Sequence, residues 1–201
     1  MAEAPQCGAV LLAAGGSSRM GRAKQLLPIG DTPLVRTVAE RVLAAGLAPV
    51  VVVLGAESAA VGAALHGLPL HLVENSAWAD GMGASLRCGV AELRRIAPGL
   101  AELIVVLADQ ANVTAEHLRR LQAERRGARC GMVATEVGGV PMPPVLFTAE
   151  HFSRLLALHG EVGARALLRE AGGALVLVAA PGLVDLDTPA DVARFTGGAG
   201  A

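Results

Sequence analysis

Residues 9–28 combine a glycine-rich turn with basic side chains, a combination that suits the binding of phosphate oxygens. An apolar run over residues 9–12 predicts a buried strand, and small residues follow it at positions 13–18. Glycines let backbone N–H groups approach an anion closely. Arg19 supplies a planar guanidinium and Lys24 a compact ammonium, and both groups suit phosphate. An ordinary strand-to-helix turn with two solvated basic residues is the alternative for this stretch.

The spacing of these residues excludes two common nucleotide-binding motifs. G-x-G-x-x-G, the dinucleotide-binding fingerprint, is absent. Gly16 and Gly21 have the spacing of the Walker A glycines, but Arg22 and Ala23 stand where that motif has Lys followed by Ser or Thr. The hydroxyl that holds Mg²⁺ in a P-loop is therefore missing, and we exclude an ATPase of that class.

A second glycine-rich stretch, ENSAWADGMGASLRCG, covers residues 74–89. Its loop-forming residues precede a helical pattern that begins at Ser85. A glycine-rich loop that leads into a helix N-terminus can receive an anion or the polar edge of a base. A plain loop with a capped helix is the alternative. We interpret Trp78 as a packing residue and leave it out of the candidate site.

Acidic residues follow a buried strand in the middle of the chain and recur near its end. Asp109 comes after the apolar run 103–107, and ligands of open α/β sheets bind beyond the carboxyl ends of strands. A carboxylate there suits Mg²⁺, which takes few protein oxygens and shares its shell with phosphates and water. The alternative is a helix cap or turn residue. Asp185 and Asp187 lie on one side of an extended backbone if residues 184–187 are extended. Thr188 or Asp187 also has the position of a helix cap before Pro189.

Apolar runs alternate with helical patterns along the chain, which predicts βαβ units and a mostly parallel sheet. The expected strands cover residues 49–54, 70–73, 131–137 and 174–179, and the expected helices include residues 32–45 and 57–65. Asp31 or Thr32 is expected to cap the first helix. Residues 138–144 contain two glycines and three prolines, so we expect a loop there. We expect one domain over residues 1–201, with a flexible tail at 197–201.

Composition narrows the classes of function. The chain has 201 residues, 53% of them hydrophobic, and a formal net charge of −1. This charge argues against nucleic acid and anionic membranes as partners. The three cysteines form no C-x-x-C, and the five histidines show no zinc spacing. The N-terminus does not have the pattern of a signal peptide and no apolar run reaches transmembrane length, so we expect a cytoplasmic protein.

The string L-A-A-G-x-S-x-R-M-G-x-x-K-x-L-L-P over residues 12–28 resembles the signature loop of the nucleotidyltransferases similar to molybdopterin-guanine dinucleotide synthase. Within that group the chain is most similar to the CTP:molybdenum cofactor cytidylyltransferases. G-M-x-x-S-L-x-x-G after Asn75, the string L-A-D-Q at 107–110 and D-x-D-T-P-x-D at 185–191 extend the resemblance along nearly the whole chain.

The resemblance implies a Rossmann-like, three-layer α/β/α domain of the nucleotide-diphospho-sugar transferase type and assigns the site residues. It implies Arg19, Lys24 and Asp109 as catalytic residues. It implies Mg²⁺ on Asp109 and Asp187, with Asp185 as the second choice for that ligand. The residues implied beside the nucleotide are Leu12, Ala13, Ala14, Gly15, Gly16, Ser17, Arg19, Lys24, Asn75, Gly81, Met82 and Ser85.

The implied reaction is transfer of CMP from CTP to molybdenum-molybdopterin, with release of pyrophosphate and a molybdenum hydroxylase as the recipient of the product. The chain departs from the family at Ala111-Asn112, which replace a proline and an apolar residue, and at Pro143, which replaces a polar residue. Arg165 pairs either with a pterin phosphate or with Glu161, and we favour Glu161. The alternatives are a guanylyl or uridylyl transferase with another phosphorylated acceptor, an NAD(P)H-binding oxidoreductase, and a cofactor-delivery factor.

Overall fold

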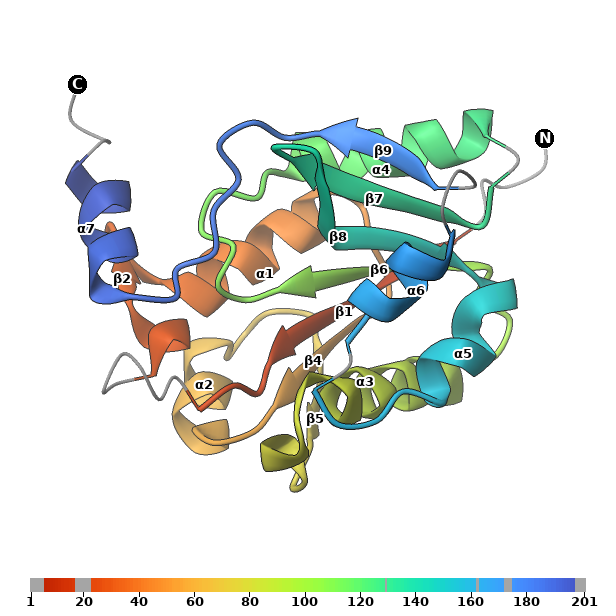
Figure 1. Ribbon diagram of the computed structural model, residues 1–201. Coiled ribbons are helices and arrows are strands. Elements are labelled where there is room, and N and C mark those ends of the chain that lie inside the picture. Colours follow the sequence, from red (N-terminus) through yellow and green to blue (C-terminus); the bar gives the residue numbers. More distant parts are fainter. Residues whose placement is uncertain (1–5, 17–22, 129, 162, 172–174, 198–201) are drawn as a thin grey trace.

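The computed structural model describes residues 6–16, 23–128, 130–161, 163–171 and 175–197 (Figure 1). Its centre is a seven-stranded sheet in the order β5-β4-β1-β6-β8-β7-β9. The strands are β1 (Cys7–Ala13), β4 (Val50–Leu54), β5 (His71–Glu74), β6 (Glu102–Leu107), β7 (Met132–Val137), β8 (Val140–Thr148) and β9 (Val176–Ala179). A separate small hairpin pairs β2 (Pro28–Ile29) with β3 (Thr32–Pro33).

Six strands of the large sheet run in one direction, and β8 runs against them. The pairs β1–β4, β1–β6, β4–β5 and β7–β9 are parallel, whereas β8 is antiparallel to both β6 and β7. The predicted mostly parallel sheet is therefore confirmed. It places the carboxyl ends of β1, β4 and β6 side by side, which brings the loops after these strands together.

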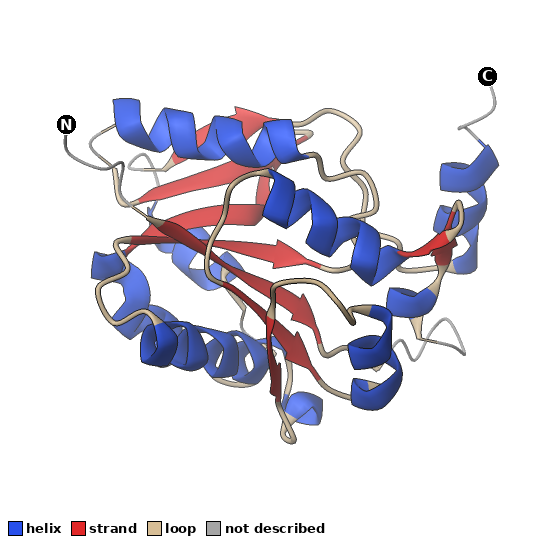
Figure 2. Cartoon of the chain, turned by 180° about the vertical axis from the view of Figure 1, so that it is seen from behind, coloured by secondary structure: helices blue, strands red, loops and turns tan. Residues whose placement is uncertain are grey.

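Helices cover both faces of the sheet (Figure 1). Figure 2 shows one face, which carries α1 (Leu34–Ala44) and α4 (Ala115–Gly127). The other face carries α3 (Met82–Ile96), α5 (Phe152–Leu156) and α6 (Arg165–Ala171). The remaining helical elements are α2 (Ser58–Ala64), α7 (Pro189–Gly197) and the short 3₁₀ turns η1 (Lys24–Leu26), η2 (Trp78–Asp80) and η3 (Ala149–His151). The result is the expected three-layer α/β/α arrangement.

Buried strands explain why both faces need covering. All five residues of β4 and all six of β6 are buried, as the uninterrupted apolar runs predict. Side chains alternate along β1, so Ala9 and Leu11 join the core under α1 and α4, whereas Val10 joins the core under α3.

Helix α3 packs unusually close to the sheet at Gly89. A Cβ atom there would lie 2.5 Å from Cγ1 of Val10 and 2.7 Å from Cγ2 of Val53. Only a residue without a side chain fits between the helix and these strands. This contact holds α3 against β1 and β4, with its N-terminal end directed to the loops beyond them.

The prediction of a loop over residues 138–144 is wrong, because β8 begins at Val140. Gly138 and Gly139 have φ angles of 57° and 83°, so two residues suffice to reverse the chain between β7 and β8. Pairing of β8 with β6 begins only at Val145, so the prolines at 141, 143 and 144 stand opposite no strand on that side. The pairing with β7 is irregular where two of these prolines lie.

Three other boundaries also differ from the expectations. Helix α3 begins at Met82 rather than at Ser85, and α1 begins after Pro33 without a side-chain cap from Asp31 or Thr32. Helix α7 includes Gly197, where the tail was expected to begin, and residues 198–201 lie outside the described part of the chain. No helix within the described residues is long and apolar enough to cross a membrane.

Candidate active site

The glycine-rich turn after β1 is held by a side chain from η1. The amide nitrogen of Gln25 donates to the carbonyl oxygen of Ala13 at 3.1 Å and to that of Gly15 at 2.7 Å. Gln25 is buried, so these bonds are protected from water. They fix the backbone of the turn up to Gly16, the last residue described before residues 17–22, which include the predicted Ser17 and Arg19.

The second glycine-rich stretch approaches the same turn from α3. Asn75 is buried, and its amide nitrogen donates to the hydroxyl oxygen of Ser85 at 3.1 Å. Gly81 has a φ of 109°, and a Cβ atom there would lie 2.6 Å from the backbone of Gly160. Only glycine satisfies both the left-handed backbone and this close approach. The segment is therefore fixed at both ends, with the start of α3 between them.

A cavity of about 300 Å³ lies between these two stretches and the end of β6. The predicted residues that line it are Leu12, Ala14, Gly15, Gly16, Lys24, Gly81, Met82, Ser85 and Asp109. Ala13 and Asn75 do not line it: Ala13 faces the core on the other side of β1, and Asn75 acts on the cavity through Ser85. The structure thus gathers most of the sequence-predicted residues around one hollow.

Some lining residues were not predicted, and Trp78 corrects an expectation. Trp78 lines the cavity although we had interpreted it as a packing residue only. Its ring lies so close to Gly16 that a Cβ there would be 2.9 Å from Cζ3. Gln25 and Glu161 also line the cavity. No local pattern singles out these three residues, because their role depends on which loops the fold brings together.

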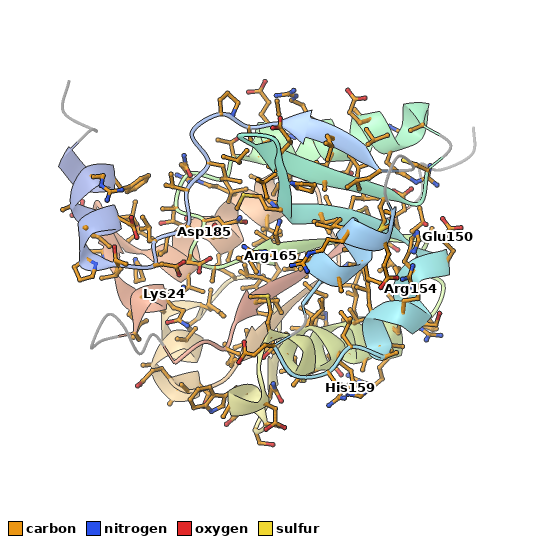
Figure 3. The ribbon with its side chains drawn as sticks, viewed as in Figure 1. Lys24, Glu150, Arg154, His159, Arg165 and Asp185 are labelled. Carbon is orange, nitrogen blue, oxygen red and sulfur yellow. The ribbon has the colours of Figure 1, made fainter. Side chains whose placement is uncertain are left out.

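Lys24 lies between carboxylates from distant parts of the chain. Its ammonium group bonds to Oδ2 of Asp109 and, at 2.9 Å, to Oδ1 of Asp187. Burial disfavours the charged amine, but the Asp109 and Asp187 carboxylates outweigh that effect, so the pKa of Lys24 is raised. Lys24 therefore stays positively charged at the wall of the cavity. Figure 3 shows it beside Asp185, at the carboxyl end of the sheet.

Asp185 occupies a different position from Asp187. Its Oδ1 accepts a hydrogen bond of 3.2 Å from Gln110, whose amide also donates to the carbonyl oxygen of Pro143 at 2.7 Å. Burial, followed by the nearby Asp109 carboxylate, raises the pKa of Asp185. Of the two C-terminal acids, Asp187 is thus the one that shares Lys24 with Asp109.

The carboxylate oxygens of Asp109 and Asp187 around Lys24 fit a divalent cation. Oδ1 of Asp109 is buried and has no hydrogen-bond partner among the described residues, so one oxygen lone pair faces no donor. No cluster of three or more His, Cys, Asp or Glu in the described part of the chain is arranged to hold a metal. Two carboxylates supply only part of a coordination shell, which suits Mg²⁺ because this ion takes its remaining ligands from water and phosphate oxygens.

Arg165 does not form the ion pair that the sequence analysis favoured. It begins α6 and is exposed (Figure 3). No ion pair joins Arg165 to Glu161 among the described residues. Instead, Gly163 packs against Met82, and Glu161 faces the cavity. Pro143 contributes its backbone carbonyl to Gln110 rather than a side-chain group to the cavity.

Comparison with known proteins shows the family to which the sequence is similar. The model of a family described as the MobA-like NTP transferase domain matches residues 9–175. Nicotine blue oxidoreductase of Paenarthrobacter nicotinovorans is 34% identical over 168 residues, which cover 80% of each chain. Purine catabolism protein PucB of Bacillus subtilis is 31% identical over 193 residues, which cover 90% of this chain and 91% of PucB.

A solved structure shares the fold over almost its full length. The protein Rv0371c of Mycobacterium tuberculosis is 29% identical, with a TM-score of 0.81, and the match covers 96% of this chain and 99% of that one. Rv0371c has also been crystallised in complex with manganese; that structure is 28% identical, with a TM-score of 0.75, and the match covers 94% of this chain and 97% of that one.

Proposed function

The chain belongs to the MobA-like NTP transferase family, and on that premise we propose that it is a Mg²⁺-dependent cytidylyltransferase that transfers CMP from CTP to molybdenum-molybdopterin. The observation that carries the proposal is the contact of Lys24 with both Asp109 and Asp187 beside the cavity. Transfer of a nucleotidyl group needs positive charge around a triphosphate and no protein nucleophile. A phosphate oxygen of the acceptor would attack the α-phosphorus of CTP, and the bond to pyrophosphate would break.

The side chains at the cavity divide this work among them. Lys24 would move its ammonium to the triphosphate and stabilise the departing pyrophosphate, with Arg19 as the second cation that we propose for this role. Asp109 and Asp187 would hold Mg²⁺, which when bound neutralises charge on the phosphates. The glycine-rich turn, whose backbone Gln25 fixes, would cradle the phosphates with its N–H groups. Asn75 would orient Ser85 toward the nucleoside.

Base preference and acceptor can be tested in two steps. First, the melting temperature is measured with CTP, GTP, ATP or UTP, each with Mg²⁺. Selective binding of CTP should raise it by about 5 °C or more at about 100 times the dissociation constant. Second, pyrophosphate release is measured with CTP and molybdenum-molybdopterin. A larger shift with GTP or UTP, and pyrophosphate release with another phosphorylated acceptor, would replace the cytidylyl assignment by the alternative transferases.

A second candidate function is an NAD(P)H-dependent oxidoreductase. It is favoured by the similarity to nicotine blue oxidoreductase, 34% identical over 80% of the chain. The absence of a G-x-G-x-x-G fingerprint argues against it. Loss of NADPH absorbance at 340 nm with a dye acceptor, without pyrophosphate release from any triphosphate, would establish this function instead. A protein that shows neither pyrophosphate release nor NADPH oxidation, but transfers a preformed cofactor to a molybdenum hydroxylase, would be a delivery factor.

A further inference from the structure

The C-terminal segment 182–187 runs alongside the loop that follows β6, and hydrogen bonds join the two at every second residue. Asn112 donates from its side-chain nitrogen to the carbonyl oxygen of Gly182. Its side-chain oxygen accepts from the backbone N–H of Val184 at 3.1 Å. The carbonyl oxygen of Asp109 accepts from the backbone N–H of Leu186 at 3.0 Å. The Asn112 side chain thus substitutes for the backbone of an adjacent strand.

Both partners in this contact are anchored independently. Leu183 and Leu186 are buried in the core beneath α1 and α4, which holds the segment down without specifying its position along the loop. On the opposite side, Arg41 of α1 donates to the carbonyl oxygens of Ala111 and, at 3.0 Å, Val113. Because apolar burial has no directional preference, hydrogen bonds specify the register between segment and loop: the two Asn112 bonds, the backbone bond from Leu186 to Asp109 and the bond from Gln110 to Asp185. Asn112 supplies two of them.

The register decides where Asp187 lies. Asp187 reaches Lys24 at 2.9 Å, across 163 positions of sequence, and Lys24 in turn contacts Asp109. A slip of the segment by one residue would turn Asp187 away from Asp109. The position of the second carboxylate therefore depends on a side chain that touches neither the cavity nor Lys24 in the structure.

From this arrangement we infer that Asn112 is a positioning residue, which sets the affinity of the Asp109–Asp187 pair for a divalent cation by holding the segment 182–187 in register. The inference rests on the proposed function, because it takes these two carboxylates as metal ligands. Groups that orient metal ligands typically contribute 10- to 100-fold to metal affinity. Since Asn112 acts through a segment of backbone, we expect an effect at the lower end of this range, about tenfold.

The test measures Mn²⁺ affinity by electron paramagnetic resonance, with the full chain and with Mn²⁺ alone or with CTP. Asn112→Ala should weaken Mn²⁺ binding about tenfold and raise the KM for metal, while kcat at saturating metal changes less than about twofold. Thr114→Ala is the matched control: it removes the cap of α4 in the same loop, where the Thr114 hydroxyl accepts from the N–H of His117, but does not touch the segment. It should lower the melting temperature and leave Mn²⁺ affinity unchanged.

A double-mutant cycle separates positioning from general destabilisation. In an Asp187→Ala background, Asn112→Ala should have no further effect on Mn²⁺ affinity, because the group that it positions is gone. Val184→Pro removes the N–H that Asn112 accepts from and should reproduce the loss, which keeps the inference testable if the first variant misfolds. Three results would overturn the inference. The first is that Asn112→Ala and Val184→Pro bind Mn²⁺ as tightly as the wild type. The others are additive effects of Asn112→Ala and Asp187→Ala on Mn²⁺ affinity, and an equal loss of Mn²⁺ affinity in Thr114→Ala. Absence of Mn²⁺ binding by the wild type would instead overturn the proposed metal site.

Discussion

At the amino end of β6, Glu102 faces Arg125 of α4, whereas just beyond the carboxyl end of the same strand Asp109 faces Lys24 and Asp187. Both ends therefore combine one largely buried acid with a basic side chain, and Asp187 at the carboxyl end is exposed. At the amino end Oε1 of Glu102 lies 3.5 Å from Nε of Arg125, and Nη1 of Arg125 also donates to the carbonyl of Ala128. These charges connect α4 to the sheet.

The carboxyl end differs in one respect, because Asp109 and Lys24 line a cavity. Each end holds a buried polar atom without a hydrogen-bond partner among the described residues: Oδ1 of Asp109 at the carboxyl end and Nε of Arg125 at the amino end. Leaving a buried polar atom unpaired costs about 1–3 kcal/mol. Such a cost persists where surrounding structure imposes it and function needs the group. The comparison teaches that buried charge alone does not identify a site; an unsatisfied acceptor beside a hollow does.

The largest difference in kcat is expected between two variants that each neutralise one acid, at opposite ends of β6. Asp109→Asn should lower kcat by about 1000-fold, because it removes a carboxylate that we propose as a metal ligand. Glu102→Gln should leave kcat within about twofold but lower the stability by about 1–3 kcal/mol, since Arg125 loses its partner. Pyrophosphate release and thermal unfolding measure the two effects. A large loss of kcat in Glu102→Gln would remove the distinction between the ends.

A loss about tenfold smaller is expected from Lys24→Ala. The variant removes the cation between Asp109 and Asp187 and should cost about 3 kcal/mol in the transition state, or roughly 100-fold in kcat. Lys24→Arg keeps the charge and should recover part of the rate. Turnover of Lys24→Ala near that of wild type would refute the role of Lys24 as a phosphate-binding cation.

Much of the fold could be predicted because the signals for its elements are local. Apolar runs mark β4 and β6, and Thr114 caps α4 as its type predicts. The start of β8 was missed because prolines usually exclude a strand, and their tolerance here depends on where pairing with β6 begins.

The candidate site was predictable only in part, for the same reason. Lys24 and Asp109 each come after a strand, so the local pattern made them candidates, and the family resemblance assigned their roles. The contact of Lys24 with Asp187 spans 163 positions and depends on the register of the C-terminal segment, which no local signal encodes. Trp78 enters the cavity wall only because η2 packs against Gly16.

Fluorescence of Trp78 gives a direct test of whether the carboxyl end receives a nucleotide. Trp78 is the only tryptophan of the chain, and it lines the cavity with its side chain partly exposed. Addition of CTP with Mg²⁺ should change its emission by roughly 20% or more, because a base or ribose beside the indole alters its surroundings. Trp78→Phe should abolish the signal and change kcat less than about tenfold. Unchanged emission at a CTP concentration that shifts the melting temperature would place the nucleotide elsewhere.

The smallest effect is expected at the amino end, where Cys7 pairs in register with Glu102. Burial, reinforced by the Glu102 carboxylate, raises the pKa of the Cys7 thiol to about 12. At pH 8 only about one Cys7 in ten thousand would be a thiolate, the form that reacts with iodoacetamide. Mass spectrometry should therefore find Cys130, which is partly exposed, alkylated well before Cys7, with no change in kcat. Alkylation of Cys7 at the rate of Cys130 would show that the amino end of β6 opens to solvent more readily than the burial of Cys7 implies.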